Sequence, residues 1–223
     1  MTDFVTLSSD EETQETATTT RSTDLLGDNW LTGETIYDYL AQKLLDCLVI
    51  DPIVFQQDIK EKGIWGSRVD LGCGLVVVPI HSGDHWFTCC MDPRNGVAMV
   101  LDSLRKPFVP AIRDKLLQIG QALVDSLLPP GTKKPPKPFL IVEAVTEQFT
   151  LQFDTASCGP LTCLLSEAMY RGESLFFDRQ EIREWRQKAH AFLTSADVRI
   201  QVSPLQVVEG KPRKGARREK KKK

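Results

Sequence analysis

Three side chains that lie far apart in the sequence have the types and placement needed for thiol chemistry. His85 stands where an expected strand begins, and Asp102 stands where the returning strand of the same hairpin ends. Cys158 opens an expected helix, and a helix N-terminus carries roughly half a positive charge. That charge and a neighbouring imidazolium lower the pKa of a thiol, while a carboxylate holds the imidazole in place. The three residues therefore predict the nucleophile, base and orienting acid of thiol acyl transfer.

A fourth candidate is an amide side chain near the expected nucleophile. Gln152 lies six residues before Cys158, on the loop that enters the helix. Its N–H₂ group would join the Cys158 backbone N–H in an oxyanion hole, where the loss of one donor typically costs roughly 10²–10³ in rate. We therefore predict that Gln152 lines the site.

The elements that must position these residues follow from the apolar patterns. Helices are expected where apolar residues recur at helical spacing, and strands where apolar and β-branched residues form short runs. The expected helices are 30–47, 54–62, 110–128, 158–170 and 177–193, and the expected strands are 75–80, 86–91, 97–101 and 139–144. The strands 86–91 and 97–101 are expected to pair antiparallel, joined by a turn at 92–96. Because helices and strands do not alternate regularly, the fold class is α+β.

The composition of the 223 residues, 41% hydrophobic and 26% charged, is typical of a soluble domain with tails. No apolar run approaches the roughly 20 residues that span a bilayer, and no apolar signal segment opens the chain. We therefore expect an intracellular protein of the nucleus or cytoplasm, without membrane contact. The six cysteines form no CxxC pair, so we expect reduced thiols and neither a metal nor a cofactor. His81, four residues before His85, is expected to be a surface histidine.

Opposite charges gather at the two ends of the chain. Residues 1–28 carry seven carboxylates against one arginine, and residues 211–223 carry nine basic residues against one acid. We expect a disordered acidic tail at 1–28, a folded domain at 29–205 and a disordered basic tail at 206–223. Phe4–Leu7 and the acids after it have the form of a SUMO-interacting segment, with a solvated tail as the alternative. The basic tail would contact importin or nucleic-acid phosphates, or only aid solubility.

Four stretches resemble the motifs of one peptidase family. They are WLTGETIYDYL (30–40), PIHSGDHW (79–86), LDSL (101–104) and QFDTASCG (152–159). Together they resemble the ubiquitin-like-protein-specific cysteine peptidases, which are the SUMO proteases and their relatives of the adenovirus-protease type. The resemblance covers roughly residues 29–195. It implies a papain-like cysteine peptidase of the SUMO-protease type, with a central mixed sheet and the nucleophile at the N-terminus of a central helix.

The resemblance also implies roles for individual residues. It makes Cys158 the nucleophile, His85 the general base, Asp102 the acid that orients the base, and Gln152 part of the oxyanion hole. No cofactor takes part in this chemistry.

Two tryptophans complete the implied site. Trp30 and Trp86 would form a narrow clamp whose indole faces admit only residues without side chains, such as the Gly-Gly end of a modifier. The sequence departs from the family pattern at Gly33 and Ser157, where the family usually has aspartate. The resemblance implies that both departures lie where substrate choice is set.

The activity expected on these grounds is that of a thiol peptidase or isopeptidase. It would cleave after the small-residue tail of a ubiquitin-like modifier such as SUMO, either in precursor processing or in deconjugation. One alternative is a cysteine protease that processes a viral or mobile-element polyprotein. Another is a non-catalytic protein that binds the modifier. An acetyltransferase of related fold is disfavoured by Asp102, where that class has glutamate, and by Gln152.

Overall fold

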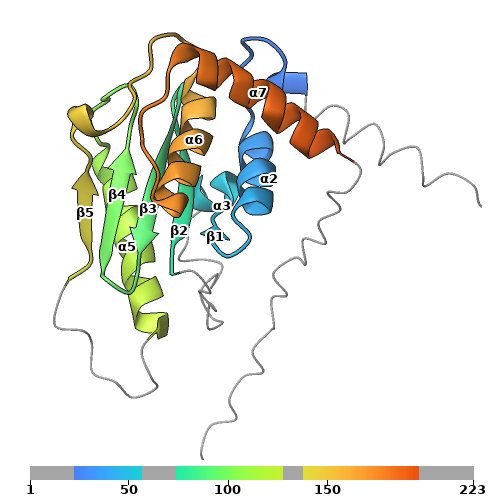
Figure 1. The fold of residues 1–223 in the computed structure, drawn as a ribbon. Helices are drawn as coiled ribbons and strands as arrows, with labels where there is room; N and C mark the ends of the chain where they lie inside the picture. The colour runs from blue at the N-terminus through green and yellow to red at the C-terminus, as the bar shows by residue number, and fades with distance from the viewer. Residues whose placement is uncertain (1–22, 57–73, 128–137, 196–223) are drawn as a thin grey trace, which may run out of the picture.

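The structure is a computed structural model, and it describes residues 23–56, 74–127 and 138–195. The elements in chain order are η1 (Thr23–Leu25), α2 (Gly33–Lys43), β1 (Leu48–Val49), α3 (Pro52–Gln56), β2 (Val76–Ser82), β3 (His85–Asp92), β4 (Val97–Leu101), α5 (Pro110–Leu127), β5 (Leu140–Glu143), η2 (Thr146–Gln148), α6 (Cys158–Arg171) and α7 (Arg179–Thr194). Figure 1 shows how they are arranged.

The strands form a five-stranded sheet in the order β1-β2-β3-β4-β5. The three central strands pair antiparallel through tight hairpins, while β1 and β5 add in parallel at the two edges. The predicted α+β fold with a central mixed sheet is therefore confirmed. In the first hairpin Ser82 pairs with His85, which places the histidine directly at the turn.

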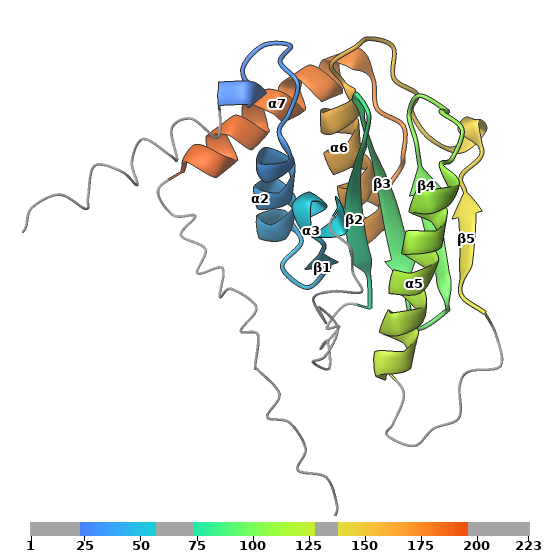
Figure 2. The same ribbon diagram turned by 180° about the vertical axis from the view of Figure 1, so that it is seen from behind.

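Helices cover both faces of this sheet. Helix α5 lies against one face, and α6, α2 and α7 lie on the other (Figure 1 and, from behind, Figure 2). Successive strand residues point to opposite faces, so Val78 packs in the core under α5 and Val77 in the core under α2 and α6. A strand that is buried on both faces reads as a continuous apolar run. This explains why the run that became β2 was recognisable in the sequence.

Helix α6 lies on strand β3, with which it shares its most extensive packing. Ten of its residues are buried, including Cys158 at its first position. The helix ends where Gly172 adopts a left-handed conformation with φ of 66°, which glycine allows without a steric penalty. The predicted central helix with Cys158 at its N-terminus is present.

The first predicted helix begins later than its apolar pattern indicated. Thr32 caps α2 by accepting a hydrogen bond from the backbone N–H of Thr35, so Trp30 precedes the helix. Strand β1 was not predicted. Only the start of the helix expected at 54–62 is described, as part of α3. Of the expected disordered tails 1–28 and 206–223, only residues 23–28 are described, and there the prediction is wrong, because Thr23–Leu25 form η1 with Leu25 buried. In the described parts of the chain, every helix is too short or too polar to cross a bilayer.

Gly120 lets α5 approach the segment before β5 closely. A Cβ atom at this position would lie 2.3 Å from Cε1 of the buried Phe139 ring. Alanine in a helix ordinarily stabilises relative to glycine by roughly 0.5–1 kcal/mol. Because of the clash, we expect Gly120→Ala instead to destabilise the protein by about 1–3 kcal/mol.

Thermal denaturation checks this prediction, since each kcal/mol lowers the melting temperature by about 2–4 °C in a chain of this size. The double variant Gly120→Ala/Phe139→Leu is the control, because a smaller side chain at 139 relieves the overpacking. An increase in melting temperature for Gly120→Ala alone would show that the close approach is not a constraint.

Candidate active site

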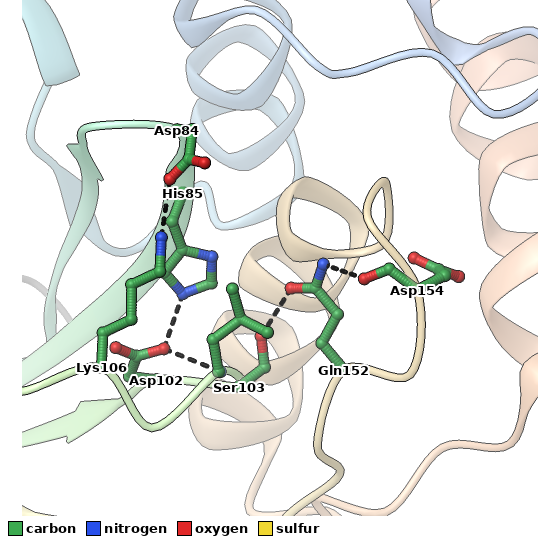
Figure 3. A network of polar contacts seen from close by, with 8 residues as sticks. Asp84, His85, Asp102, Ser103, Lys106, Gln152 and Asp154 are labelled. Atoms are coloured by element: carbon green, nitrogen blue, oxygen red, sulfur yellow. Dashed lines mark hydrogen bonds and ion pairs between the residues drawn. The ribbon is translucent and has the colours of Figure 1, made fainter.

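The hairpins bring His85 and Asp102 together at one end of the sheet. His85 opens β3 after the turn at Gly83 and Asp84, and Asp102 follows the last residue of β4. His85 Nε2 lies 2.6 Å from Asp102 Oδ1 (Figure 3). The imidazole is 1% exposed and the carboxylate 16% exposed. The pairing predicted from the hairpin is therefore present, and it is largely shielded from water.

Local contacts hold the Asp102 carboxylate toward the ring. The backbone N–H of Leu104 donates to Asp102 Oδ1 at 2.9 Å, which closes a tight turn after β4. Beside this turn, Lys106 Nζ lies 2.6 Å from Asp84 Oδ1 and so links it to the β2–β3 turn (Figure 3). Both partners of this ion pair are exposed, so it adds little stability but joins the two loops that carry His85 and Asp102.

The second ring nitrogen of His85 is available for another group. Among the described residues, Nδ1 is buried without a hydrogen bond of ordinary geometry. Cys158 nevertheless interacts with this ring. Burial alone would lower the pKa of His85, but hydrogen bonding with Asp102 and with Cys158 outweighs it and raises the pKa to about 9. The imidazole therefore carries a proton at neutral pH.

Cys158 shows the complementary shift. Burial alone would raise the pKa of its thiol. The interaction with His85, together with hydrogen bonds from the backbone N–H groups of Trp86 and Gly159, lowers the pKa below its ordinary value. A lowered thiol pKa beside a raised imidazole pKa favours a thiolate–imidazolium pair, which is the reactive form of a nucleophilic cysteine.

The alkylation of Cys158 by iodoacetamide should reveal this pair. We expect the rate to reach a plateau at a pH below the ordinary thiol pKa of roughly 8.5, because the pKa of the Cys158 thiol is lowered. A further change in rate is expected as the pH rises through about 9, where His85 loses its proton. The measurement is the alkylation rate from acid to alkaline pH. A single rise centred at the ordinary thiol pKa would contradict the ion pair.

Gln152 lies on the loop before α6, as predicted, but its amide is engaged within that region. The backbone N–H of Gln152 donates to the carbonyl oxygen of Ser103 at 2.9 Å. Its Nε2 group donates to the carbonyl oxygen of Asp154, and its Oε1 accepts from Ser103 Oγ at 3.4 Å (Figure 3). One of the two Nε2 hydrogens of Gln152 is therefore engaged within the loop. The role of Gln152 as a donor to an oxyanion at Cys158 stays a prediction.

The two tryptophans belong to segments that contact each other, but they differ in exposure. Trp86 Nε1 donates to the carbonyl oxygen of Leu31 at 3.1 Å, so its indole lies beside the segment that carries Trp30. Trp30 is 47% exposed, whereas Trp86 is 5% exposed and packs against His81, with 4.5 Å between the ring centroids and the ring planes tilted by 37°. A Cβ at Gly33 would lie 3.3 Å from Trp86 Cη2. The indole thus occupies the space that a side chain at position 33 would need.

A carboxylate missed in the sequence orders the loop before the nucleophile. Asp154 Oδ1 accepts from the backbone N–H groups of Ala156 and Ser157 at 2.9 and 2.7 Å, and Oδ2 accepts from Ser157 Oγ at 2.6 Å. The departure at Ser157 is therefore paired with an acid three residues earlier. An aspartate followed by a small polar residue at this spacing is the sequence signal of such a side-chain turn.

Gly159 permits a second close approach at the nucleophile. A Cβ there would lie 2.9 Å from Leu31 Cβ, so Leu31 packs directly on the first turn of α6.

Within residues 23–56, 74–127 and 138–195, no group of three or more His, Cys, Asp or Glu side chains gathers as metal ligands do.

One family of known proteins matches a large part of this chain. Residues 57–196 match the Ulp1 protease family, C-terminal catalytic domain. In a comparison with curated proteins, none matches the chain.

Several solved structures share the fold. A structure of the SUMO protease Ulp1 with its catalytic cysteine oxidised to a sulfinic acid is 18% identical, with a TM-score of 0.61 over 78% of this chain and 82% of that one. The Ulp1 protease domain in complex with Smt3, the yeast ortholog of SUMO, is 18% identical, with a TM-score of 0.59 over 78% and 81% of the two chains. The Ulp1-like SUMO protease catalytic domain of Chaetomium thermophilum is 15% identical, with a TM-score of 0.52 over 82% and 89%. Since the family match spans more than half of its length, the chain belongs to the Ulp1 protease family, whose members are cysteine peptidases.

Proposed function

We propose that this chain is a thiol peptidase that cleaves after the small-residue C-terminal tail of a ubiquitin-like modifier such as SUMO. The reaction would process a modifier precursor or release the modifier from a lysine. The observation that carries this proposal is the buried His85–Asp102 pair at 2.6 Å beside a Cys158 thiol whose pKa is lowered. A family member of the same fold has been crystallised with Smt3, the yeast ortholog of SUMO, which supports the choice of substrate.

The proposed reaction uses the charges that the site holds at rest. The Cys158 thiolate attacks the scissile carbonyl carbon, and the resulting oxyanion accepts hydrogen bonds from the Cys158 backbone N–H and from Gln152. The His85 imidazolium gives its proton to the leaving amine as the C–N bond breaks, which leaves a thioester on Cys158. The neutral imidazole then takes a proton from water, whose oxygen attacks the thioester carbon. The C–S bond breaks, which releases the modifier with a free C-terminal carboxyl group and restores the Cys158 thiolate beside the His85 imidazolium. Asp102 holds the ring in one orientation throughout.

The entrance for the modifier tail would lie at Trp30. Its half-exposed side chain directly precedes Leu31, whose carbonyl oxygen accepts from Trp86 Nε1 and whose side chain packs on the first turn of α6. A passage between an aromatic face and the nucleophile helix favours residues without side chains, such as the Gly-Gly end of a modifier.

Labelling with activity probes tests the proposal. SUMO, ubiquitin and other modifiers that end in a propargyl group should be presented to the full chain, and the adduct located by mass spectrometry. We expect a SUMO adduct on Cys158 and none in a Cys158→Ala variant. If no modifier labels Cys158 or is hydrolysed at its C-terminus, the proposal fails. Cleavage of polyprotein-derived peptides instead would favour the viral or mobile-element alternative.

Gln152 is proposed as a donor to the oxyanion, and an isosteric variant tests this role. Gln152→Glu keeps the size of the side chain but replaces the donating amide by an accepting carboxylate. We expect kcat for a modifier substrate to fall by about 10²–10³-fold with little change in KM. The control is Gln148→Glu in η2, which is exposed. An unchanged kcat for Gln152→Glu would remove this residue from the oxyanion hole.

We also propose that the peptidase domain runs to residue 205, starting with η1 at Thr23 rather than at residue 29, and that the basic tail directs the protein to the nucleus. The nine basic residues of 211–223 motivate the second part. Imaging a variant that ends at Gly210 tests it, because an unchanged distribution would show that the tail is not a targeting signal.

A further inference from the structure

Arg186 of α7 is a buried cation at the junction of three segments. The residue is 5% exposed, although arginine is rarely buried unless it is paired. Its Nη2 donates to the carbonyl oxygens of Asn29 and Ala156, both at 2.9 Å, and its Nη1 lies 3.3 Å from the carbonyl oxygen of Asp24. One guanidinium therefore serves three backbone carbonyls, each of which is at least 30 residues away from Arg186 in the sequence.

Two of these carbonyls belong to the parts of the candidate site that must face each other. Asn29 directly precedes Trp30, the exposed indole at the proposed entrance, and Ala156 lies two residues before Cys158. Burial alone would lower the pKa of Arg186, while the negative charges of Asp28, Asp154, Asp24 and Cys158 favour its charged form. Cys158 is therefore close enough to sense the guanidinium.

The third carbonyl extends this connection to the start of α2. The carboxylate of Asp24 accepts from the backbone N–H of Thr32 at 2.8 Å and from Thr35 Oγ1 at 3.0 Å. Asn29 Nδ2 donates back to the carbonyl oxygen of Leu26 at 2.9 Å. The segment from Asp24 to Thr32 is thus fastened at both ends, and Arg186 is the side chain that joins it to the nucleophile loop.

We propose that Arg186 is a positioning residue. It holds the Trp30 segment (residues 24–32) at a set distance from the nucleophile loop (residues 152–157), which leads into Cys158. This inference rests on the proposed function only in naming the substrate tail as the group that passes between the two. A planar guanidinium with five donors can serve three carbonyls at once, whereas an ammonium on a flexible stem concentrates its donors at one point. Lysine at position 186 keeps the charge but does not reproduce this geometry.

Two variants of the full chain test the proposal, Arg186→Lys and Arg186→Gln, with Arg183→Gln on the exposed face of α7 as the matched control. The first readout is amide hydrogen exchange, which needs no substrate. We expect faster exchange in residues 24–32 of both Arg186 variants, with the amides of β3 still protected. Arg183→Gln should exchange as the wild type does.

The second readout separates positioning from the reactivity of the thiol. A displacement of about 1 Å between substrate and nucleophile costs about 10²-fold in rate, so we expect a loss of that order in kcat/KM for a modifier substrate. The alkylation of Cys158 by iodoacetamide does not use the Trp30 segment, and it should keep its rate and its pH profile in Arg186→Lys.

The outcomes are distinguishable. Unchanged exchange in residues 24–32 of both variants would overturn the proposal, and so would alkylation that falls in parallel with cleavage. Loss of β3 protection in Arg186→Lys would also overturn it, because the residue would then support the whole fold. If the wild type cleaves no modifier, the proposed function fails, while hydrogen exchange still decides whether Arg186 joins the two segments.

Discussion

Replacement of Cys158 by alanine is expected to lower kcat for a modifier substrate by at least about 10⁴-fold, which is the scale on which removal of a catalytic nucleophile acts. The reason is that the proposed reaction passes through a thioester on this sulfur. Without the sulfur, only the binding groove and the oxyanion donors remain. The measurement is hydrolysis of a fluorogenic modifier conjugate under single-turnover conditions, with equal amounts of folded protein.

The control for this experiment is Cys47→Ser. Cys47 is half-buried in the segment between α2 and β1 and takes no part in the proposed mechanism, so we expect the activity of Cys47→Ser to match the wild type. Cys158→Ala should also still bind the modifier, because it removes only the sulfur. Cleavage by Cys158→Ala at the wild-type rate would refute the proposed mechanism, and binding without cleavage by the wild type would favour the non-catalytic alternative.

Replacement of His85 by alanine is expected to lower kcat/KM by about 10³–10⁴-fold. Two effects combine in this variant. The interaction with His85 is the largest contribution that lowers the pKa of the Cys158 thiol, so the resting nucleophile reverts to a protonated thiol. The leaving amine also loses its proton donor. Steady-state cleavage at pH 7 and alkylation of Cys158 across the pH range measure the two effects separately.

His190→Ala is the matched control, because this histidine lies on α7 and belongs to no part of the proposed mechanism. We expect His190→Ala to keep the wild-type rate and alkylation profile. If His85→Ala retained the alkylation profile of the wild type, the imidazole would not be the group that activates Cys158. The proposed assignment of the base would then be wrong.

The sequence predicted the sheet and the major helices because burial sets their composition. Strands β2 and β3 are covered on both faces, so they appear as apolar runs, and α5 keeps a regular apolar stripe. Strand β1 consists of Leu48 and Val49 alone, and two residues are too few to show a pattern of apolar residues typical of a strand. The start of α2 was placed too early because Trp30 is apolar but precedes the Thr32 cap.

Only part of the candidate site could be predicted from the sequence. His85 and Asp102 follow from hairpin geometry, since the ends of paired strands must meet. The burial of Trp86 under His81 and against Gly33 depends on packing between elements distant in sequence, and no local pattern reports it. Arg186 was missed because its partners are backbone carbonyls, which every residue possesses.

The ion pair at the nucleophile has a consequence for folding itself. In the unfolded chain, between pH values of roughly 6.5 and 8.5, histidine is neutral and cysteine is protonated, so the two groups together hold one proton. The contribution of His85 alone would be lost as the pH rises through about 9, and that of Cys158 alone would be lost as the pH falls through its lowered pKa. In the part of this interval that lies above the lowered pKa of Cys158, the folded pair also holds one proton, now on His85. Across that part folding transfers a proton between the two side chains and exchanges none with the solvent, so this pair adds no slope to the dependence of stability on pH.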